Sequence, residues 1–440
     1  MKFAALTTAV LGLGTSGEAA AKLLRREGAN VTVFDSADFP ALRERAAKMQ
    51  ALGIGTVLGP KAEQASDRFD LTVISPGIDP EVPLVKNFIR QNARLTGELE
   101  LAFQFCSKPI IAITGTNGKT TTTQLVELML KRAGISAIAC GNIGMPFCEA
   151  IAQQNDFEFF AVEVSSFQLE TISRFRPKVA VWLNLTPDHL DRYRDVWEYR
   201  QAKLRIFEQQ RADDFAVINA RDDLPKLLAD TISFSAYPGR ADFSASGNAI
   251  LFRGEPVLDV TQTNLTGVHN LENLMAALGV AWALGIPWEK ASIGLKEYRL
   301  LPHRCEVVGQ IDGVTFINDS KATNLDALVK ALESQSRPVV LIAGGKDKGF
   351  PFDTVAKLVG ARAKHAVLIG EMAERIRRSW AAEIDCSLAN GLDEAISLAR
   401  RNARPGDTVL FSPGTSSFDM FKNYSDRGNQ FRQRVQELAK

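Results

Sequence analysis

Short apolar or β-branched runs alternate with longer helical patterns along most of the chain. Near the N-terminus, for example, runs at 9–11, 31–35 and 71–74 are separated by stretches rich in alanine and leucine. This alternation predicts an α/β fold with mainly parallel strands. Open parallel sheets bind ligands at the carboxyl ends of their strands, so the loops that follow these runs are the candidate sites.

The runs fall into three groups, and 440 residues exceed what one hydrophobic core usually organises. We predict an N-terminal Rossmann-like domain at 1–96, a central P-loop ATPase domain with a mainly parallel sheet at 97–301, and a C-terminal Rossmann-like α/β domain at 302–440. Short alternating segments with glycine breaks at 231–262 predict a small antiparallel appendage. The later strands are expected at 110–113, 160–164, 179–183, 215–218, 314–317, 339–342, 366–369 and 408–411.

The most informative stretch reads TGTNGKTTT from residue 114 to residue 122 and lies between a predicted strand and a predicted helix. Glycines let backbone N–H groups converge on an anion, and the helix adds its positive N-terminal end. Lys119 would reach the β- and γ-phosphates of ATP, and the Thr120 hydroxyl would bind Mg²⁺. The loop is a contracted P-loop because Ile113 stands where the first glycine is expected. A glycine turn with a surface lysine is the alternative, and the coincidence of elements favours ATP.

Two later strands end in potential metal ligands. Glu163 lies near the end of one apolar strand, and the segment 184–191 after the next strand contains Asp188, His189 and Asp191. Because parallel strands end at one edge of a sheet, these side chains predict a metal site beside the phosphate loop. For His189 alone, a hydrogen-bonded structural histidine is the alternative.

A second glycine turn, GLGTSG at 12–17, follows the first predicted strand, and Asp35 ends the next one. This pattern satisfies the dinucleotide fingerprint, so an NAD-dependent oxidoreductase is one alternative. A glycine turn at a helix N-terminus holds any diphosphate, however, and the motif alone does not identify the ligand. The loop at 75–77 should emerge at the same edge of the sheet.

Charge and cysteine content narrow the setting. The 52 basic and 51 acidic residues give a net charge of +1, which predicts neither a nucleic-acid partner nor an acidic membrane partner. The five scattered cysteines include no CxxC pair and fit a reduced compartment. The apolar N-terminus runs directly into the glycine turn and no apolar stretch is long enough to span a bilayer. We therefore expect a cytoplasmic, monomeric protein.

Taken together, the motifs resemble the Mur ligases and their relatives, the folylpolyglutamate synthetases. Those shared with the whole group are TGTNGKTTT, VEVSSFQLE at 162–170, NLTPDHLDR at 184–192, YRQAK at 199–203 and GVHNLENLMAA at 267–277. Those that look most like the D-glutamate-adding branch are PHRCE at 302–306, NDSKATN at 318–324, AGGKDKG at 343–349 and SPGTSSFDMFKNYSDRGNQF at 412–431. The match spans nearly the whole chain, and the last motif is the most specific.

The resemblance implies ATP-dependent ligation of D-glutamate to UDP-N-acetylmuramoyl-L-alanine through an acyl phosphate. It implies two Mg²⁺ sites, one on Thr120 and Glu163 and one on His189 and Lys203. Lys203 matches a lysine that is carbamylated in the family, which turns a cation into an oxygen ligand; an exposed helical lysine is the alternative. Catalytic roles fall to Lys119, His189 and Lys203.

The resemblance also assigns binding residues. For ATP they are Gly115, Thr116, Asn117, Gly118, Lys119, Thr120, Thr121, Asn273, Arg304 and Asp319. For the UDP-substrate they are Gly14, Thr15, Ser16, Asp35, Ser36, Ser75, Pro76, Gly77 and Asn142. For D-glutamate they are Lys321, Thr323, Lys348, Ser417 and Phe418. The family often has a Thr-Arg pair after the acidic residue, whereas Ser36-Ala37 follows Asp35 here.

Two further alternatives remain open from the residues. A nucleotide-regulated binding protein would use ATP for domain closure without ligation, but the acidic strand ends and Lys203 argue against it. Folylpolyglutamate synthesis is compatible with the fold, but the C-terminal motif and the predicted UDP domain weigh against it.

Overall fold

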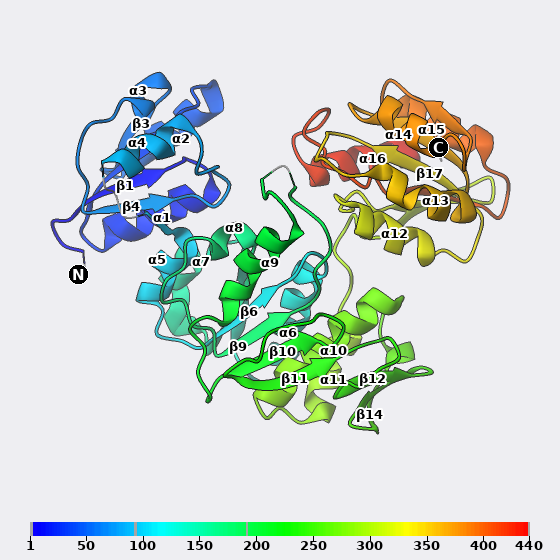
Figure 1. Ribbon diagram of the computed structural model, residues 1–440, viewed down its shortest axis with the longest axis horizontal. Coiled ribbons are helices and arrows are strands. Elements are labelled where there is room, and N and C mark those ends of the chain that lie inside the picture. The colour runs from blue at the N-terminus through cyan, green and yellow to red at the C-terminus, as the bar shows by residue number, and fades with distance from the viewer. Residues whose placement is uncertain (1–2, 92–94, 191, 439–440) are drawn as a thin grey trace. The chain divides into compact units, whose positions relative to one another are not determined.

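The computed structural model describes residues 3–91, 95–190 and 192–438, so Asp191 lies outside the described residues. The described residues form three sheets, of five, nine and six strands. Figure 1 labels strands of each, such as β1, β6 and β17. It divides into two compact units: the first comprises residues 1–185, 197–263 and 270–298, and the second comprises 186–196, 264–269 and 299–440. The three sheets confirm the predicted α/β class with mainly parallel strands.

The first sheet is entirely parallel, in the order β3-β2-β1-β4-β5. Successive residues of β1 face opposite sides: Val10 packs in one apolar cluster with α1 and α2, and Ala9 and Leu11 pack in another with α3 and α4. Helices therefore cover both faces, as expected of a Rossmann-like domain. The strands are β1 (Thr7–Leu11), β2 (Asn30–Asp35), β3 (Gly55–Leu58), β4 (Leu71–Ile74) and β5 (Leu95–Gly97). The helices are α1 (Thr15–Arg26), α2 (Pro40–Ala51), α3 (Pro60–Glu63) and α4 (Pro83–Arg90).

Helix α5 (Glu98–Phe105) follows the first sheet and packs on α7 (Phe147–Ala150) of the central domain. Its first turn buries two carboxylates, each about 1% exposed. Glu100 accepts hydrogen bonds from the backbone N–H groups of Ser173, Arg174 and Phe175. Glu98 accepts one from the backbone N–H of Cys148 at 2.5 Å. These contacts join the first two sheets within one unit.

The central sheet has nine strands in the order β14-β13-β12-β11-β10-β9-β6-β8-β7. The segment predicted as a small antiparallel appendage extends this sheet: β11 pairs parallel to β10 and to β12, whereas the β12–β13 and β13–β14 pairs are antiparallel as predicted. The strands are β6 (Ile110–Thr114), β7 (Ala137–Gly141), β8 (Phe159–Glu163), β9 (Val179–Trp182), β10 (Phe215–Asn219), β11 (Asp230–Phe234), β12 (Phe243–Ser246), β13 (Ala249–Phe252) and β14 (Glu255–Asp259). The helices are α6 (Lys119–Arg132), α7, α8 (Ser166–Leu169), α9 (Val196–Leu204), α10 (Val268–Ala283) and α11 (Trp288–Glu297), with short η1 (Ile151–Asp156), η2 (Arg205–Phe207) and η3 (Val260–Gln262).

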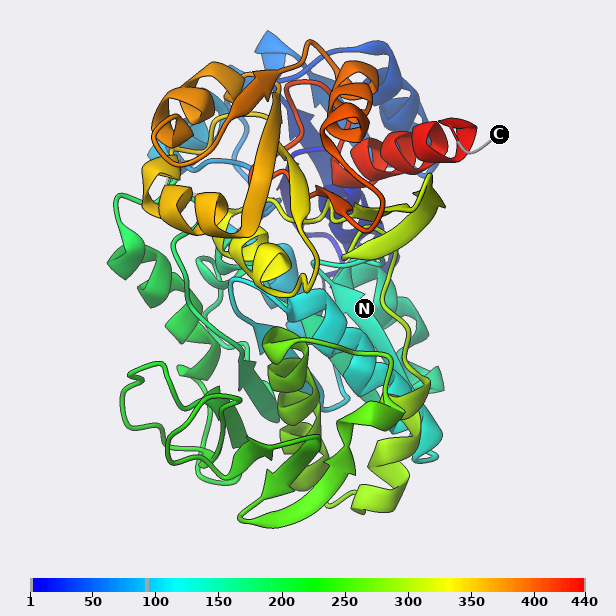
Figure 2. The same cartoon turned by 90° about the vertical axis from the view of Figure 1, so that its right-hand side faces the viewer.

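The third sheet has the order β15-β16-β20-β17-β18-β19, and all its pairs are parallel except β15–β16. One apolar cluster joins it to α12, α13 and α14, and another joins its opposite face to α15 and α16. Figure 2 shows helices on both sides of this sheet in the yellow-to-red part of the ribbon. The strands are β15 (Glu306–Ile311), β16 (Val314–Asn318), β17 (Val339–Gly344), β18 (Ala363–Ile369), β19 (Cys386–Leu388) and β20 (Thr408–Phe411). The helices are α12 (Leu325–Glu333), η4 (Phe352–Val355), α13 (Ala356–Arg362), α14 (Ala373–Trp380), α15 (Leu392–Asn402) and α16 (Tyr424–Leu438).

None of the helices in the described part of the chain combines the length and the apolar character that crossing a membrane requires.

Candidate functional site

The phosphate loop lies between β6 and α6, as predicted, and a neighbouring strand end fixes its shape. The Asn184 side chain, just beyond β9, accepts a hydrogen bond from Asn117 N at 2.9 Å and donates one to Asn117 O at 3.1 Å. The backbone carbonyl of Asn184 also accepts from Thr116 N at 2.9 Å. Asn184 therefore clamps the loop on three backbone groups, a role that the sequence did not reveal.

Gly118 has φ +86°, and a Cβ at this position would lie 2.3 Å from Oδ1 of Asn273. The same Asn273 oxygen accepts a hydrogen bond from the Thr122 hydroxyl at 3.2 Å. Asn273, on α10, thus packs directly behind the loop at the start of α6. Only glycine combines this backbone conformation with this close approach.

Two lysine ammonium groups meet at one carbonyl of the loop. Lys119 Nζ donates to the carbonyls of Gly115 at 3.0 Å and Thr116 at 2.9 Å, and Lys203 Nζ donates to the same Gly115 carbonyl at 2.9 Å. Lys203 is only 1% exposed, and its ammonium lies 4.7 Å from the centroid of the Tyr199 ring. The alternative of an exposed helical lysine is therefore wrong for Lys203. This local concentration of positive charge and N–H groups suits a polyphosphate.

A buried carboxylate faces the start of α6. Glu163, at the end of β8, is 3% exposed and accepts hydrogen bonds from the Thr120 hydroxyl at 2.7 Å and from the Asn142 amide at 2.8 Å. Thr120 and Glu163 thus come together as predicted. Asn142, predicted as a UDP-substrate residue, lies beside this carboxylate at the end of β7.

The residues present fit a magnesium ion that is shared with a nucleotide. Within the described ranges, His, Cys, Asp and Glu side chains form no group of three that could hold a metal. Magnesium in nucleotide enzymes commonly uses one or two protein oxygens and takes its remaining ligands from phosphates and water. The hard oxygens of Thr120 and Glu163 provide such a partial set.

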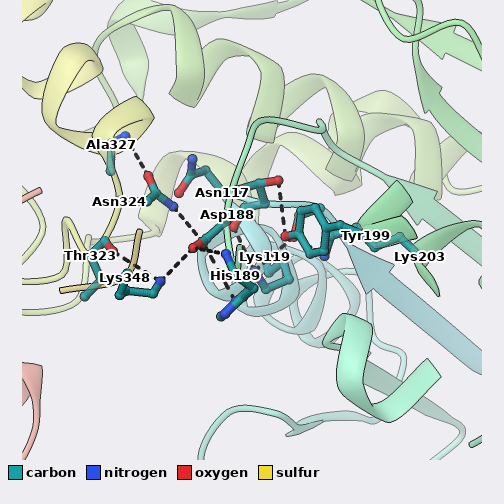
Figure 3. Close-up of polar contacts among 12 residues, drawn as sticks. Asn117, Lys119, Asp188, His189, Tyr199, Lys203, Thr323, Asn324, Ala327 and Lys348 are labelled. Carbon is teal, nitrogen blue, oxygen red and sulfur yellow. Dashed lines mark hydrogen bonds and ion pairs between the residues drawn. The ribbon is translucent and has the colours of Figure 1, made fainter. Parts of the chain in front are cut away.

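Asp188 and His189 belong to the second unit, where Asp188 forms a nearly buried ion pair with Lys348 (Figure 3). Asp188 Oδ1 lies 2.6 Å from Lys348 Nζ, and the two side chains are 7% and 11% exposed. Asp188 Oδ2 accepts from the Asn324 amide at 3.1 Å, and Asn324 in turn caps α12 by accepting from Ala327 N at 2.9 Å. Lys348, predicted to hold D-glutamate, is therefore positioned by a carboxylate.

The same network sets the ionisation of Asp188. Burial alone would raise its pKa, but the charges of Lys348 and His189 outweigh burial and lower the pKa to about 2. The His189 backbone N–H also donates to Asp188 Oδ1 at 2.8 Å, and His189 has φ +55°. Asp188 is thus a permanent anion at neutral pH.

The other predicted D-glutamate residues also lie in the second unit. Lys321 Nζ lies 3.9 Å from the centroid of the Tyr424 ring, and the Thr323 carbonyl faces Lys348 Nζ at 3.5 Å. Ser417 is 3% exposed and its neighbour Phe418 is 67% exposed.

Of the two residues predicted to contact ATP from the third domain, Asp319 has its oxygens engaged within the unit. They accept from Cys305 N at 3.1 Å and from the Ser412 hydroxyl at 2.8 Å. Burial raises the pKa of Asp319 to about 6. Arg304 belongs to the same unit and precedes Cys305.

The glycine turn of the first domain and the loop after β4 lie side by side. Ser75 N donates to the carbonyl of Leu11 at 3.0 Å, and the Ser75 hydroxyl approaches the carbonyl of Gly12. Asp35 accepts from Leu13 N at 2.8 Å and from Ala37 N at 2.9 Å, so it braces the glycine turn and the loop after β2. Gly14, Thr15, Ser36 and Gly77 are exposed there, with Ser16 and Pro76 partly buried.

A further residue that the sequence did not single out is Arg427, in the long C-terminal motif. Its side chain is 1% exposed, and its guanidinium donates to Ser320, Thr415 and Ser416. The long C-terminal motif was the available sequence signal for Arg427. The motif does not reveal the partner Ser320, which lies more than a hundred residues before Arg427 in the chain.

Comparison with known proteins gives three consecutive family matches. The Mur ligase MurD-like N-terminal domain matches residues 6–97, the Mur ligase middle domain matches 113–281, and the Mur ligase glutamate ligase domain matches 303–414. They correspond to the three sheets.

Relatives that match nearly the whole chain, and a solved structure with the same fold, also belong with the Mur ligases. Proteins named UDP-N-acetylmuramoylalanine–D-glutamate ligase are 43% identical over 441 residues in Trichlorobacter lovleyi, covering 98% of each chain, and 42% identical over 440 residues in Geotalea daltonii, covering 98% of this chain and 97% of the relative. The crystal structure of UDP-N-acetylmuramate-alanine ligase from Thermotoga maritima has the same fold, with a TM-score of 0.64, 20% identity, and coverage of 98% of this chain and 99% of that one.

Proposed function

Because this chain belongs to the Mur ligase family, we propose that it ligates D-glutamate to UDP-N-acetylmuramoyl-L-alanine with hydrolysis of ATP to ADP and phosphate, as a cytoplasmic step of peptidoglycan precursor synthesis. The observation that carries the ATP-dependent chemistry is the phosphate loop, with Lys119, Lys203 and the Thr120–Glu163 pair gathered around it. The choice of amino acid and acceptor rests on similarity, over nearly the whole chain, to proteins named UDP-N-acetylmuramoylalanine–D-glutamate ligase.

We assign one substrate to each sheet. Residues 1–96 would bind the UDP-sugar through the adjoining loops at 12–17 and 75–77, and residues 97–301 would bind ATP. Residues 302–440 would bind D-glutamate. A single chain would carry all three, so no second subunit is required.

Amide formation from a free carboxylate is unfavourable because oxide is a poor leaving group. Phosphorylation by ATP converts the carboxylate oxygen into phosphate, which leaves readily. The γ-phosphoryl group passes to the alanyl carboxylate, the amine of D-glutamate attacks the acyl carbon, and the tetrahedral intermediate collapses with loss of phosphate. Lys119 and the N-terminus of α6 would stabilise the charge on the transferring group, because phosphoryl transfer depends mainly on positioning and electrostatics. Mg²⁺, when bound by Thr120 and Glu163, would neutralise phosphate charge.

The attacking amine must lose a proton. Asp188 is a poor acceptor at neutral pH because its pKa is about 2. We assign the proton to His189 in the state in which its ring binds no metal, because a neutral imidazole has one lone-pair nitrogen and cannot ligate Mg²⁺ and accept a proton at once. We assign the binding of the amino acid to Lys348, Lys321, Thr323, Ser417 and Phe418.

We also propose that Lys203 is carbamylated and, with His189, holds a second Mg²⁺. An ammonium cannot ligate a metal, whereas a carbamate offers oxygen atoms. Support comes from the burial of Lys203 against the phosphate loop. Labelling with ¹³C-bicarbonate should give a carbamate signal by NMR in the wild-type enzyme and in Lys119→Ala, and no signal in Lys203→Arg. A wild-type enzyme without the signal would overturn this assignment.

The reaction itself is tested by a coupled ADP assay. ADP release should require both D-glutamate and UDP-N-acetylmuramoyl-L-alanine, and Lys119→Ala should remove it. ADP release that is unchanged without the amino acid would exclude ligation, and turnover with NAD would favour the oxidoreductase alternative.

A further inference from the structure

Arg427 joins the segments that carry the proposed D-glutamate residues. Its Nε donates to the Ser320 hydroxyl at 3.0 Å and its Nη2 donates to the Ser320 carbonyl at 2.8 Å. Its Nη1 donates to the carbonyls of Thr415 at 3.2 Å and Ser416 at 3.3 Å. One guanidinium therefore fixes the backbone immediately before Lys321 and immediately before Ser417.

A third segment is attached to the same group. Ser416 forms a β-bridge with Lys346, whose backbone N–H donates to the Ser416 carbonyl at 3.0 Å. A Cβ on Gly345 would lie 3.3 Å from Arg427 Nη1 and 2.2 Å from the Ser416 carbonyl, so the segment leading to Lys348 packs closely on this bridge. The position of Lys348 thus depends on a strand segment that Arg427 holds.

The charge of Arg427 is not neutralised by direct contact. All four hydrogen bonds go to uncharged oxygens, and the structure records no ion pair for Arg427 with any described carboxylate. Burial lowers the pKa of Arg427 to about 9, although Asp419 and Asp319 oppose this, so the group is still charged at neutral pH. A buried charge of this kind is costly unless something anionic completes its surroundings.

We propose that Arg427 is a positioning residue for the amino-acid substrate: it locks the segments at 320–323, 345–348 and 415–418 into one binding surface and contributes the positive field that favours an amino acid with two carboxylates. This inference rests on the proposed D-glutamate ligation and adds to it the residue that organises the subsite. Arg427 acts through its neighbours and is not assigned any contact with the substrate.

The variants separate geometry from charge. Arg427→Lys keeps the positive charge but loses the planar guanidinium that makes the four hydrogen bonds. Arg427→Gln loses both the charge and the guanidinium. Since hydrogen bonds from a charged group are worth about 1.5–3 kcal/mol, the KM for D-glutamate should rise about tenfold to a hundredfold, more in Arg427→Gln than in Arg427→Lys. The KM for ATP and for the UDP-acceptor should change less than about twofold, because these ligands do not use the three segments.

Two further measurements keep the proposal falsifiable if the Gln variant folds poorly. Ser320→Ala removes the partner of Arg427 Nε, together with the bond from the Ser320 hydroxyl to the Tyr424 carbonyl, and leaves the other three Arg427 bonds in place. It should raise the KM for D-glutamate by a smaller factor. In Arg427→Ala, added guanidinium at concentrations far below those that denature proteins should lower the KM for D-glutamate again. Arg434→Gln is the matched control: Arg434 lies on α16 with Arg427, and this change breaks its ion pair with Asp393 of α15. It should leave all three KM values unchanged.

An equal rise in all three KM values, a fall in kcat with an unchanged KM for D-glutamate, or no guanidinium response would overturn the proposal. Failure of the underlying function is recognised separately, because the wild-type enzyme would then release no ADP in response to D-glutamate.

Discussion

Identical side chains acquire different roles here through their surroundings. Asp188 and Asp347 each pair with a cation, but the Asp188–Lys348 side chains are 7% and 11% exposed, whereas those of Asp347 and Arg375 are 37% and 58% exposed. A surface pair contributes little because water screens it, while breaking a buried pair leaves an uncompensated charge.

We therefore predict that Asp188→Asn destabilises the second unit by about 3–5 kcal/mol, and that Asp347→Asn costs less than about 1 kcal/mol. Urea unfolding monitored by hydrogen exchange in the third domain measures both. Similar losses in the two variants would contradict the burial argument.

Glu98 and Glu100 are a second instructive pair, two residues apart and equally buried. Desolvation raises the pKa of Glu98 from 4.5 to about 7, although its bond with the Cys148 N–H opposes the rise. Folding therefore favours the protonated form of Glu98. The resulting stability is fully present below about pH 4.5 and is lost as the pH rises through about 7.

Glu98→Gln imitates the protonated side chain. It should match the wild-type stability at pH 4.5, and at pH 8 it should be more stable by about 3 kcal/mol. Chemical unfolding at the two pH values tests this. Glu100→Gln is the contrasting variant: it weakens charge-assisted bonds to three backbone N–H groups and should be destabilising at pH 8. A pH-independent difference for Glu98→Gln would refute the assignment.

At the scale of elements, the phosphate loop requires glycine at position 118. The steric reason for this requirement can be separated from the cost of the left-handed backbone by comparison with a second glycine. Gly118 and Gly134 flank the same helix with nearly equal φ, +86° and +88°, but only Gly118 has a neighbour within 4 Å of an added Cβ. A substitution at either position therefore incurs the cost of a non-glycine residue in a left-handed backbone. Only at Gly118 would the added side chain also clash with Asn273.

Gly118→Ala should abolish detectable ATP binding, because Asn273 and the loop must move apart. Gly134→Ala should lose about 1–2 kcal/mol of stability and retain nucleotide affinity. Isothermal titration with ATP and Mg²⁺ compares them. Normal affinity in Gly118→Ala would show that the loop tolerates the side chain.

The sequence predicted the buried central strands well because each is a nearly continuous apolar run with both faces covered. It missed strands such as β5, β7 and β19, which lie at sheet edges. The runs LTG and CSL have three residues each, and AIACG consists mostly of small residues. Edge strands bury fewer side chains, so their composition carries a weaker signal.

The phosphate-loop residues could be predicted because the spacing of glycine, lysine and threonine in a short segment indicates phosphate binding. The contacts that hold this loop in place could not be predicted. Lys203 itself was predicted from the family resemblance, but its bond to the Gly115 carbonyl spans 88 positions, and the bond between Asn184 and Asn117 spans 67. Such contacts follow from tertiary packing rather than from any local pattern.

At the scale of the whole molecule, each proposed ligand site is assigned mainly to one of the three sheets. The first unit contains the first two sheets, joined by α5 through Glu98 and Glu100, and the second unit contains the third sheet. The proposed UDP-sugar residues and most of the proposed ATP residues therefore belong to the first unit. The proposed D-glutamate residues, together with the predicted ATP residues Arg304 and Asp319, belong to the second.

This division predicts which ligand stabilises which part of the chain. ATP with Mg²⁺ at a hundred times its Kd should stabilise the first unit by about 2.7 kcal/mol, because a ligand that binds only the folded state shifts unfolding by mass action. Since α5 couples the first two sheets, hydrogen-exchange protection should rise in both of them and rise less in the third. Lys119→Ala should remove the effect while leaving the protection of the ligand-free protein unchanged. Protection confined to the central sheet would show that the first domain unfolds independently, and the buried carboxylates of α5 would then not couple the two.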